Sequence, residues 1–111
     1  MNLRESINDN PQAFVALCQD YEVKSLYAFG SSITNEFKEN ESDIDLLIEL
    51  NTADPLQRGE NLLNIWEKFE MFFHRKVDLL TSSSIKNPIL KKSIDSTKVL
   101  IYDGKELKVS F

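Results

Sequence analysis

The sequence is poor in cysteine, glycine and proline, and it contains no long apolar run. The single cysteine, Cys18, excludes an internal disulfide, and its place beside Leu17 in an apolar helical pattern predicts a small buried side chain. The longest apolar runs fall far short of the roughly 20 residues that a membrane-spanning helix needs. No basic start leads into an apolar segment, as it would in a signal peptide. We therefore expect a cytoplasmic protein without membrane association.

Positive charge is also scarce, since 13 lysines and arginines face 18 aspartates and glutamates, for a formal net charge of −5. Nucleic-acid backbones attract clustered basic side chains, so this balance argues against nucleic acid as the primary partner. A chain of 111 residues has room for one compact domain, and its hydrophobic content of 41% is typical of globular proteins. We expect residues 1–111 to form a single domain.

Three helix starts are predicted because every proline follows an asparagine or aspartate, which can cap the free N–H groups of a helix that begins at the proline. These pairs are Asn10-Pro11, Asp54-Pro55 and Asn87-Pro88. Gly59 weakens the first turn of the second helix, so its regular part is predicted to begin near Glu60. In the third helix, the spacing of Leu90 and Ile94 predicts that both are buried.

Short β-like runs lie between these helices, at 25–29, 43–50, 76–81 and 98–102. A last segment, 106–111, is either an edge strand or a frayed tail. Because helices and strands alternate, the sequence predicts an α/β sandwich.

The most informative run is 43–50, because the side-chain period of two places Asp43 and Asp45 on one face of a strand and apolar side chains on the other. Neighbouring carboxylates repel one another unless a cation lies between them, and oxygen ligands suit Mg²⁺ or Mn²⁺. Asp78 has the same setting in the run 76–81, so the three carboxylates converge if the two strands are neighbours. Two metals about 4 Å apart stabilise both oxygens of a phosphoryl transfer. The competing interpretation is a polar strand face exposed to solvent.

Upstream, the run 25–29 leads into Gly30, Ser31 and Ser32. Glycine permits close approach of the backbone to a phosphate, and a helix opening here would add its free N–H groups. The Ser31 hydroxyl suits a phosphate ligand and equally a helix cap.

In this order, Phe29-Gly30-Ser31, Ser42-Asp43-Ile44-Asp45 and Lys76-Val77-Asp78 resemble the DNA polymerase beta-like nucleotidyltransferase superfamily. More closely, the chain resembles the minimal nucleotidyltransferase (MNT) branch, to which the stretches 87–88 and 99–102 are also similar.

The resemblance implies the nucleotidyltransferase fold, an α/β (α+β) arrangement with a small mixed sheet of three core strands, further edge strands and about four helices. It implies that Gly30, Ser31 and Ser32 bind the triphosphate of ATP. It also implies that Asp43, Asp45 and Asp78 are catalytic and hold Mg²⁺ or Mn²⁺. Members of this branch are commonly encoded beside a HEPN-domain protein as toxin–antitoxin pairs, in which the MNT protein can AMPylate its partner.

One departure concerns the segment after Ser32. Many family members carry Ala-Arg-Gly there, whereas this chain has the residues 33–37, Ile-Thr-Asn-Glu-Phe. Glu36, Glu39 and Glu41 make the segment acidic, which weakens triphosphate binding unless metal or Lys38 compensates. The sequence thus predicts slow turnover or dependence on a basic group of a partner.

Three functions remain open at this point. The first is Mg²⁺-dependent transfer of AMP from ATP to a hydroxyl of a HEPN-domain partner, and the second is a non-catalytic antitoxin that occludes its partner. The third, transfer to a small molecule, lacks the additional substrate-binding chain of related aminoglycoside-modifying enzymes. The apolar side chains of 62–73 are mainly core in this interpretation, with an oligomer interface as a secondary prediction. His74 is predicted to lie at the surface or cap a helix.

Overall fold

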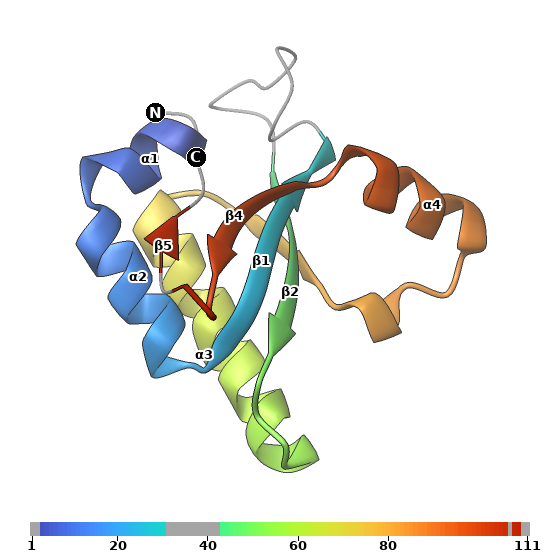
Figure 1. The fold of residues 1–111 in the computed structure, drawn as a ribbon, viewed down its shortest axis with the longest axis horizontal. Helices are drawn as coiled ribbons and strands as arrows, with labels where there is room; N and C mark the ends of the chain where they lie inside the picture. The colour runs from blue at the N-terminus through green and yellow to red at the C-terminus, as the bar shows by residue number, and fades with distance from the viewer. Residues whose placement is uncertain (1–2, 31–42, 107, 110–111) are drawn as a thin grey trace.

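A computed structural model describes residues 3–30, 43–106 and 108–109 (Figure 1). The elements follow one another as α1 (Leu3–Asp9), α2 (Pro11–Asp20), β1 (Val23–Phe29), β2 (Ile44–Leu50), α3 (Pro55–Phe73), β3 (Val77–Leu80), η2 (Ser82–Ser84), α4 (Pro88–Thr97), β4 (Val99–Asp103) and β5 (Lys108–Val109). The predicted combination of about four helices with a small sheet is confirmed.

The strands form one mixed sheet in the order β3-β2-β1-β4-β5. β2 and β3 run parallel, with α3 as the connection between them, whereas the pairs β1–β2, β1–β4 and β4–β5 are antiparallel. The C-terminal edge strand that the sequence left open is present as the two residues of β5. The mixed sheet agrees with the nucleotidyltransferase fold that the sequence motifs imply.

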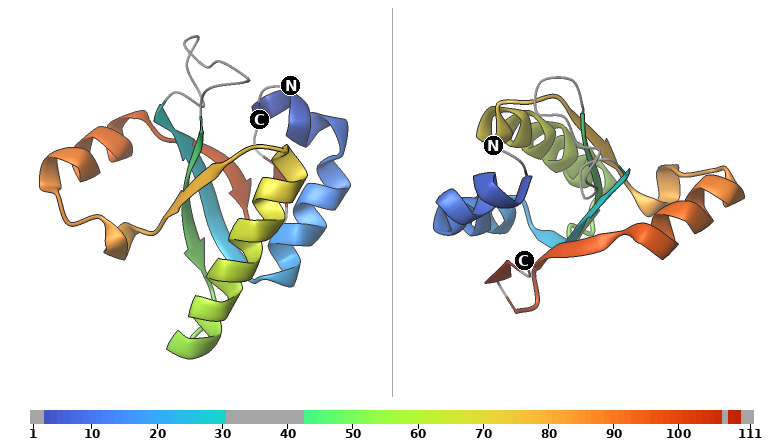
Figure 2. Two further views of the ribbon diagram at one scale, coloured as in Figure 1. Left: turned by 180° about the vertical axis from the view of Figure 1, so that it is seen from behind. Right: turned by 90° about the horizontal axis from the view of Figure 1, so that it is seen from above.

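One face of the sheet is covered by α1, α2 and α3 (Figure 2). From β2, Ile44, Leu46 and Ile48 point into this face and are almost completely buried. Aromatic side chains from α2 and α3 pack over them, with Phe14 and Phe69 both fully buried. Cys18 is buried here as predicted, and burial raises the pKa of its thiol. This face holds the main hydrophobic core.

The opposite face carries a much smaller cluster, in which Phe29 of β1, Leu47 of β2 and Ile94 of α4 are buried together. α4 lies on this side, away from the other three helices, as the view from above shows (Figure 2). Tyr27, Leu80 and Ile85 pack partly buried against the cluster. The apolar covering of this face is therefore confined to one part of it.

The three predicted helix starts are confirmed, because the side chains of Asn10, Asp54 and Asn87 each accept hydrogen bonds from backbone N–H groups in the first turn. His74 lies at the C-cap of α3, exposed and in the left-handed region with φ 53°. No helix in the described ranges combines the length and apolarity required to cross a membrane.

Two details of the helices differ from the sequence-based expectation. α3 is regular from Pro55 onward, so Gly59 does not delay it. The Asp54 cap and the bond from the Arg58 N–H to the Asp54 carbonyl hold that first turn. In α4, Ile94 is buried but Leu90 is 47% exposed. The prediction that Leu90 is buried was wrong because α4 stands at the margin of the sheet, where only Ile94 reaches the core.

The outer edge of β3 is covered by two side chains of α3. The Val77 N–H donates to a carboxylate oxygen of Glu70 at 3.0 Å, and the Trp66 indole N–H donates to the Val77 carbonyl at 2.7 Å. The carbonyl of the neighbouring Lys76 points toward β2, because it accepts from the Ile44 N–H at 3.0 Å. α3 therefore fixes the start of the strand that carries Asp78.

Candidate active site

The structure brings two of the predicted carboxylates side by side. β2 and β3 pair in parallel with Asp45 opposite Asp78. By strand alternation, Asp45 lies on the same face as Leu47, and Asp78 lies on the same face as Leu80. That face is the one opposite α1, α2 and α3. The condition that the sequence left open, namely that these two strands are neighbours, is thus met.

Asp45 is the electrostatic centre of this site. Its pKa is raised from 3.8 to about 6, first because burial disfavours the charged form and then because Asp78 and Asp43 add negative charge nearby. Asp45 is half-buried, whereas Asp78 is exposed. A carboxyl group with a pKa near 6 is still mainly ionised at neutral pH. Its ionised form has a higher free energy here than in water, because burial and the neighbouring carboxylates disfavour the charge.

Asp43 immediately precedes β2 and is half-buried. It acts on Asp45 through its charge and helps to raise the pKa of that carboxyl group. Among the described residues, no three histidine, cysteine or acidic side chains form a complete metal-ligand set as they stand in this structure. The chemistry of the donors nevertheless suits a divalent cation, because such an ion would relieve the repulsion that raises the pKa of Asp45.

Gly30 stands at the end of β1, directly beside Asp45. Its φ of +64° lies in the left-handed region, and a Cβ added there would come within 2.7 Å of a carboxylate oxygen of Asp45. β1 and β2 are antiparallel, with Phe29 opposite Asp45, so the strand end and the carboxylate share one corner of the sheet. Sequence reasoning assigned this glycine to a phosphate, and it missed the steric need imposed by Asp45. Ser31 and Ser32, like the segment 33–37, lie outside the described residues.

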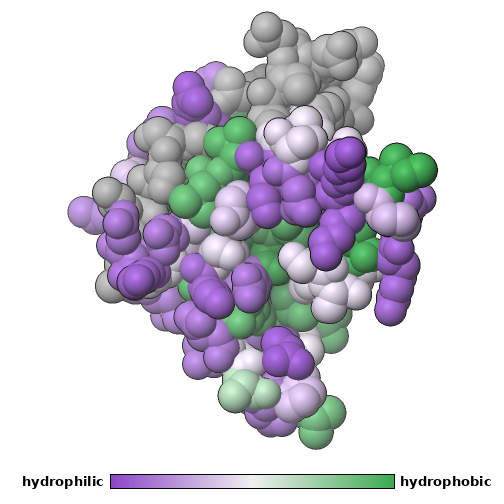
Figure 3. Space-filling view, turned by 45° about the vertical axis from the view of Figure 1, so that its right-hand side comes forward, coloured by the Kyte–Doolittle hydropathy of each residue, from purple (hydrophilic) through white to green (hydrophobic). Residues whose placement is uncertain are grey.

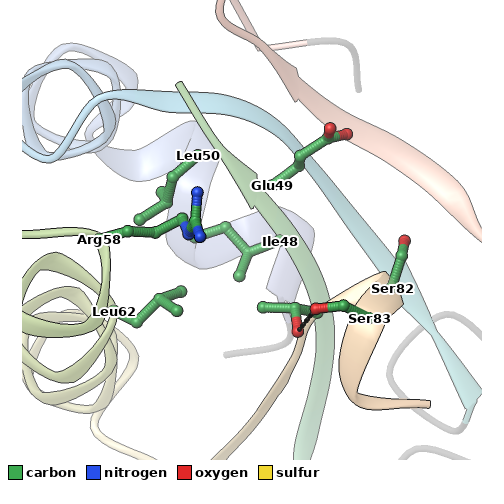
Figure 4. Close-up of a pocket in the computed structure, with 8 residues that line it drawn as sticks. Ile48, Glu49, Leu50, Arg58, Leu62, Ser82 and Ser83 are labelled. Carbon is green, nitrogen blue, oxygen red and sulfur yellow. Dashed lines mark hydrogen bonds between the residues drawn. The ribbon is translucent and has the colours of Figure 1, made fainter. Parts of the chain in front are cut away.

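A cavity of about 310 Å³ lies away from the carboxylates, at the other end of β2 (Figure 4). It is bounded by Leu50 of β2, by Arg58 and Leu62 of α3, and by the hydroxyl side chains that follow β3. Arg58 already donates to the Thr52 carbonyl at 3.3 Å. No carboxylate of the Asp43, Asp45 and Asp78 group lines this cavity. Its position therefore does not make it part of the same site.

Comparisons with known proteins agree with a nucleotidyltransferase fold for this chain. The family model described as "Polymerase beta, Nucleotidyltransferase" matches residues 12–107. Two proteins of Methanocaldococcus jannaschii, both named "Putative protein adenylyltransferase", are similar in sequence. One is 40% identical over 81 residues, which are 73% of this chain and 79% of that protein. The other is 39% identical over 85 residues, which are 77% and 83% of the two chains.

Solved structures show the same fold. A minimal nucleotidyltransferase gives a TM-score of 0.62 at 23% identity, covering 89% of this chain and 95% of that one, and is itself described as putative. A toxin–antitoxin crystal structure with AMP-PNP gives 0.60 at 22% identity, covering 87% and 76%. A third, at 0.51 and 20% identity, covers 89% and 74% and contains a tri-AMPylated Shewanella oneidensis HEPN toxin in complex with its MNT antitoxin.

Proposed function

Because the chain belongs to the polymerase beta nucleotidyltransferase family, we propose that it transfers AMP from ATP to a hydroxyl group of a protein partner. The observation that carries the proposal is the pairing of Asp45 with Asp78 across neighbouring strands, with the charge of Asp43 nearby. The names of the M. jannaschii relatives support a protein as acceptor. The neighbouring MNT–HEPN complex supports a HEPN-domain partner and a role as its antitoxin.

The transfer has a simple balance of bonds. The hydroxyl oxygen of the acceptor attacks the α-phosphorus of ATP, the new O–P bond forms, and the bond to the β-phosphate oxygen breaks, so that pyrophosphate leaves. We assign to Asp78 the acceptance of the hydroxyl proton, because Asp78 is the exposed member of the pair. Asp45 and Asp43 orient the reacting groups from the neighbouring strand. Positioning and charge stabilisation supply most of the rate enhancement in such reactions.

Asp43, Asp45 and Asp78 are the residues that would hold divalent metal, with Mg²⁺ as the first choice and Mn²⁺ as the second. Such an ion supplies Lewis-acid stabilisation of the charge that develops on the phosphate oxygens. The raised pKa of Asp45 supports this assignment, since a cation beside Asp45 would offset the negative charge of its two neighbours. Gly30, Ser31 and Ser32 are the proposed triphosphate-binding residues at the end of β1.

The decisive experiment uses the chain, a HEPN-domain protein as the proposed acceptor, Mg²⁺ and α-labelled ATP. The wild-type chain should label the HEPN-domain protein. The double variant Asp43→Asn plus Asp45→Asn should lower the rate by at least about 10³-fold, which corresponds to about 4 kcal/mol of transition-state stabilisation. Arg4→Gln, an exposed change far along the sequence from the carboxylates, serves as the control and should label normally. Equal labelling by the double variant would refute the mechanism.

A second candidate is a non-catalytic antitoxin that neutralises its partner by covering it. Two observations favour it: the segment 33–37 lacks the arginine of many family members, and the three carboxylates do not form a closed ligand set within the described residues. The two candidates differ in growth assays with the toxin. Full neutralisation by the Asp43→Asn plus Asp45→Asn variant would favour occlusion, whereas loss of neutralisation with the complex intact would favour transfer.

A further inference from the structure

We propose that α4 and its flanks, residues 86–98, form the docking surface for the acceptor protein, which would contact it through an acidic surface with apolar side chains at its centre. We call these residues the α4 arm. The inference rests on the proposed function, and it specifies where the acceptor binds and by what chemistry. Three observations carry it. The α4 arm exposes apolar side chains, its net charge is opposite to that of the rest of the chain, and it lies on the same face of the sheet as the carboxylates.

Two of the three large apolar side chains of α4 are exposed to solvent. α4 lies wholly within the described residues, and Ile94 is its single buried side chain. Ile89 is 80% exposed and Leu90 is 47% exposed, while Val99, which follows the arm, is 39% exposed. The ribbon view shows α4 projecting from the side of the sheet (Figure 1). Exposed apolar side chains that gather on one helix and are rimmed by polar residues are a feature of protein–protein interaction surfaces.

The charge of the α4 arm is opposite to that of the whole protein. Residues 86–98 contain four lysines and one aspartate, whereas the chain has a net charge of −5. Lys98 is engaged within the protein, since it pairs with Asp95 at 3.2 Å and lies over the Tyr27 ring at 4.5 Å. Lys86, Lys91 and Lys92 are exposed. Hydrophilic and hydrophobic side chains meet on this side of the molecule (Figure 3), so a complementary surface is acidic around an apolar centre.

The α4 arm is also placed to bring an acceptor to the reaction site. Ile94 packs with Phe29 and Leu47, and Phe29 is the register partner of Asp45. The carboxylates and the arm therefore share one face of the sheet, and α1, α2 and α3 lie on the other. A protein bound to the α4 arm would lie on the side from which a hydroxyl can approach Asp45 and Asp78. This continuity with the site favours the acceptor over a second copy of the chain.

The test compares two matched double variants in the labelling reaction with the HEPN-domain protein. Ile89→Ser plus Lys92→Glu removes apolar surface and reverses charge on the α4 arm. Leu56→Ser plus Lys105→Glu makes equivalent changes at exposed positions outside the α4 arm and outside 62–73. The α4 variant should raise the KM for the partner at least tenfold with the kcat and the KM for ATP unchanged, and the control variant should stay within twofold. Circular dichroism melts check that both variants fold.

The outcomes separate the inference from the function on which it rests. An unchanged KM for the partner in the α4 variant, with normal labelling by the wild type, would overturn the docking surface and leave the transferase standing. Loss of binding in the α4 variant, in a system where even the wild type labels nothing, would support the surface and remove the proposed chemistry. A homodimer of the chain alone that dissociates in the α4 variant would make a second copy the occupant and so overturn the inference.

Discussion

The two faces of the sheet differ in how much apolar surface they bury and in where the carboxylates lie. One face lies under three helices and holds a continuous core that includes Phe14, Phe69 and Phe73. The other face holds a small cluster around Phe29, Leu47 and Ile94, and carries the carboxylates beside it. The first face concentrates apolar burial, which is the main source of folding free energy. The second tolerates a carboxyl group whose charge is disfavoured, and it can do so because stability comes from elsewhere.

Aromatic packing shows how strongly the covered face is consolidated. Ring centroids of Phe14 lie 5.9 Å from Phe69, 5.5 Å from Phe72 and 6.1 Å from Phe73. Such distances are those of favourable aromatic pairs, which add to the free energy of area burial. α2 and α3 are therefore joined by one cluster of rings, whereas α4 relies on a single aliphatic side chain.

The largest expected effect comes from truncating that ring cluster. Phe69→Ala should lower the free energy of unfolding by about 3–5 kcal/mol, because a fully buried ring is replaced by a cavity. Urea denaturation followed by circular dichroism measures the change. The exposed neighbour Lys68→Ala is the control and should change it by less than about 0.5 kcal/mol. A loss below 1 kcal/mol for Phe69→Ala would contradict the division between the faces.

A smaller loss is expected on the carboxylate face. Ile94→Ala should cost about 2–3 kcal/mol, because the cluster around Ile94 is small and its site can partly collapse. Hydrogen exchange should show that opening increases mainly in 86–103 and spares α2 and α3. An equal rise in exchange over α2 and α3 would mean that the two faces are one cooperative core.

The charge of Asp45 gives a prediction of opposite sign. Its pKa is about 6 in the folded protein against 3.8 for the unperturbed group, so folding favours the protonated carboxyl. This contribution is fully present below about pH 4 and is lost as the pH rises through about 6. Asp45→Asn should therefore stabilise the metal-free protein at pH 7 by about 1–2 kcal/mol, after discounting for the half-exposed side chain.

Urea denaturation in EDTA at pH 4 and pH 7 measures this difference. The stabilisation by Asp45→Asn should appear at pH 7 and shrink toward zero at pH 4. Glu49→Gln, on the same strand but exposed and paired with Lys24, is the matched control. A stabilisation of the same size at both pH values would assign the effect to packing instead of charge. Millimolar Mg²⁺ should reduce the difference at pH 7 if the proposed metal site is correct.

The smallest expected effect concerns the cap of α4. The Asn87 side chain accepts from the N–H groups of Ile89 and Leu90 at 2.9 and 3.3 Å. Asn87→Ala should lower stability by about 1 kcal/mol, and Asn87→Asp should restore it because aspartate also caps. Thermal melts by circular dichroism compare the two. Failure of aspartate to rescue would show that Asn87 acts by something other than capping.

Much of the fold follows from local patterns. The Asn-Pro and Asp-Pro pairs located three helices, and alternation in 43–50 and 76–81 placed the apolar side chains of β2 and β3 correctly. The proximity of Asp45 and Asp78 required one further fact, the adjacency of the two strands. A local pattern cannot predict that the two strands are neighbours, because their pairing depends on the path that the chain takes through α3 between β2 and β3. The roles assigned to Asp43, Asp45, Asp78, Gly30, Ser31 and Ser32 remain proposals.

The rest escaped prediction for physical reasons. α1 offers only Leu3 and Ile7 as buried residues, and two apolar positions one turn apart are too few to reveal a helix. Leu90 has the spacing of a core residue, but burial depends on what lies opposite, and the described residues leave it 47% exposed. Gly30 was recognised as a turn glycine, yet its contact with Asp45 joins two strands that are separate in sequence.

The bonds from Trp66 and Glu70 to Val77 have a consequence for the protein at high concentration. An open strand edge is a template on which another chain can add its own strand, and repetition of that step leads to fibrils. Here the outward N–H and carbonyl of Val77 are already occupied by side chains of the same molecule. Sheet growth at this end of β3 would first have to break both bonds. α3 thus opposes strand addition at the start of β3 while it holds the strand that carries Asp78.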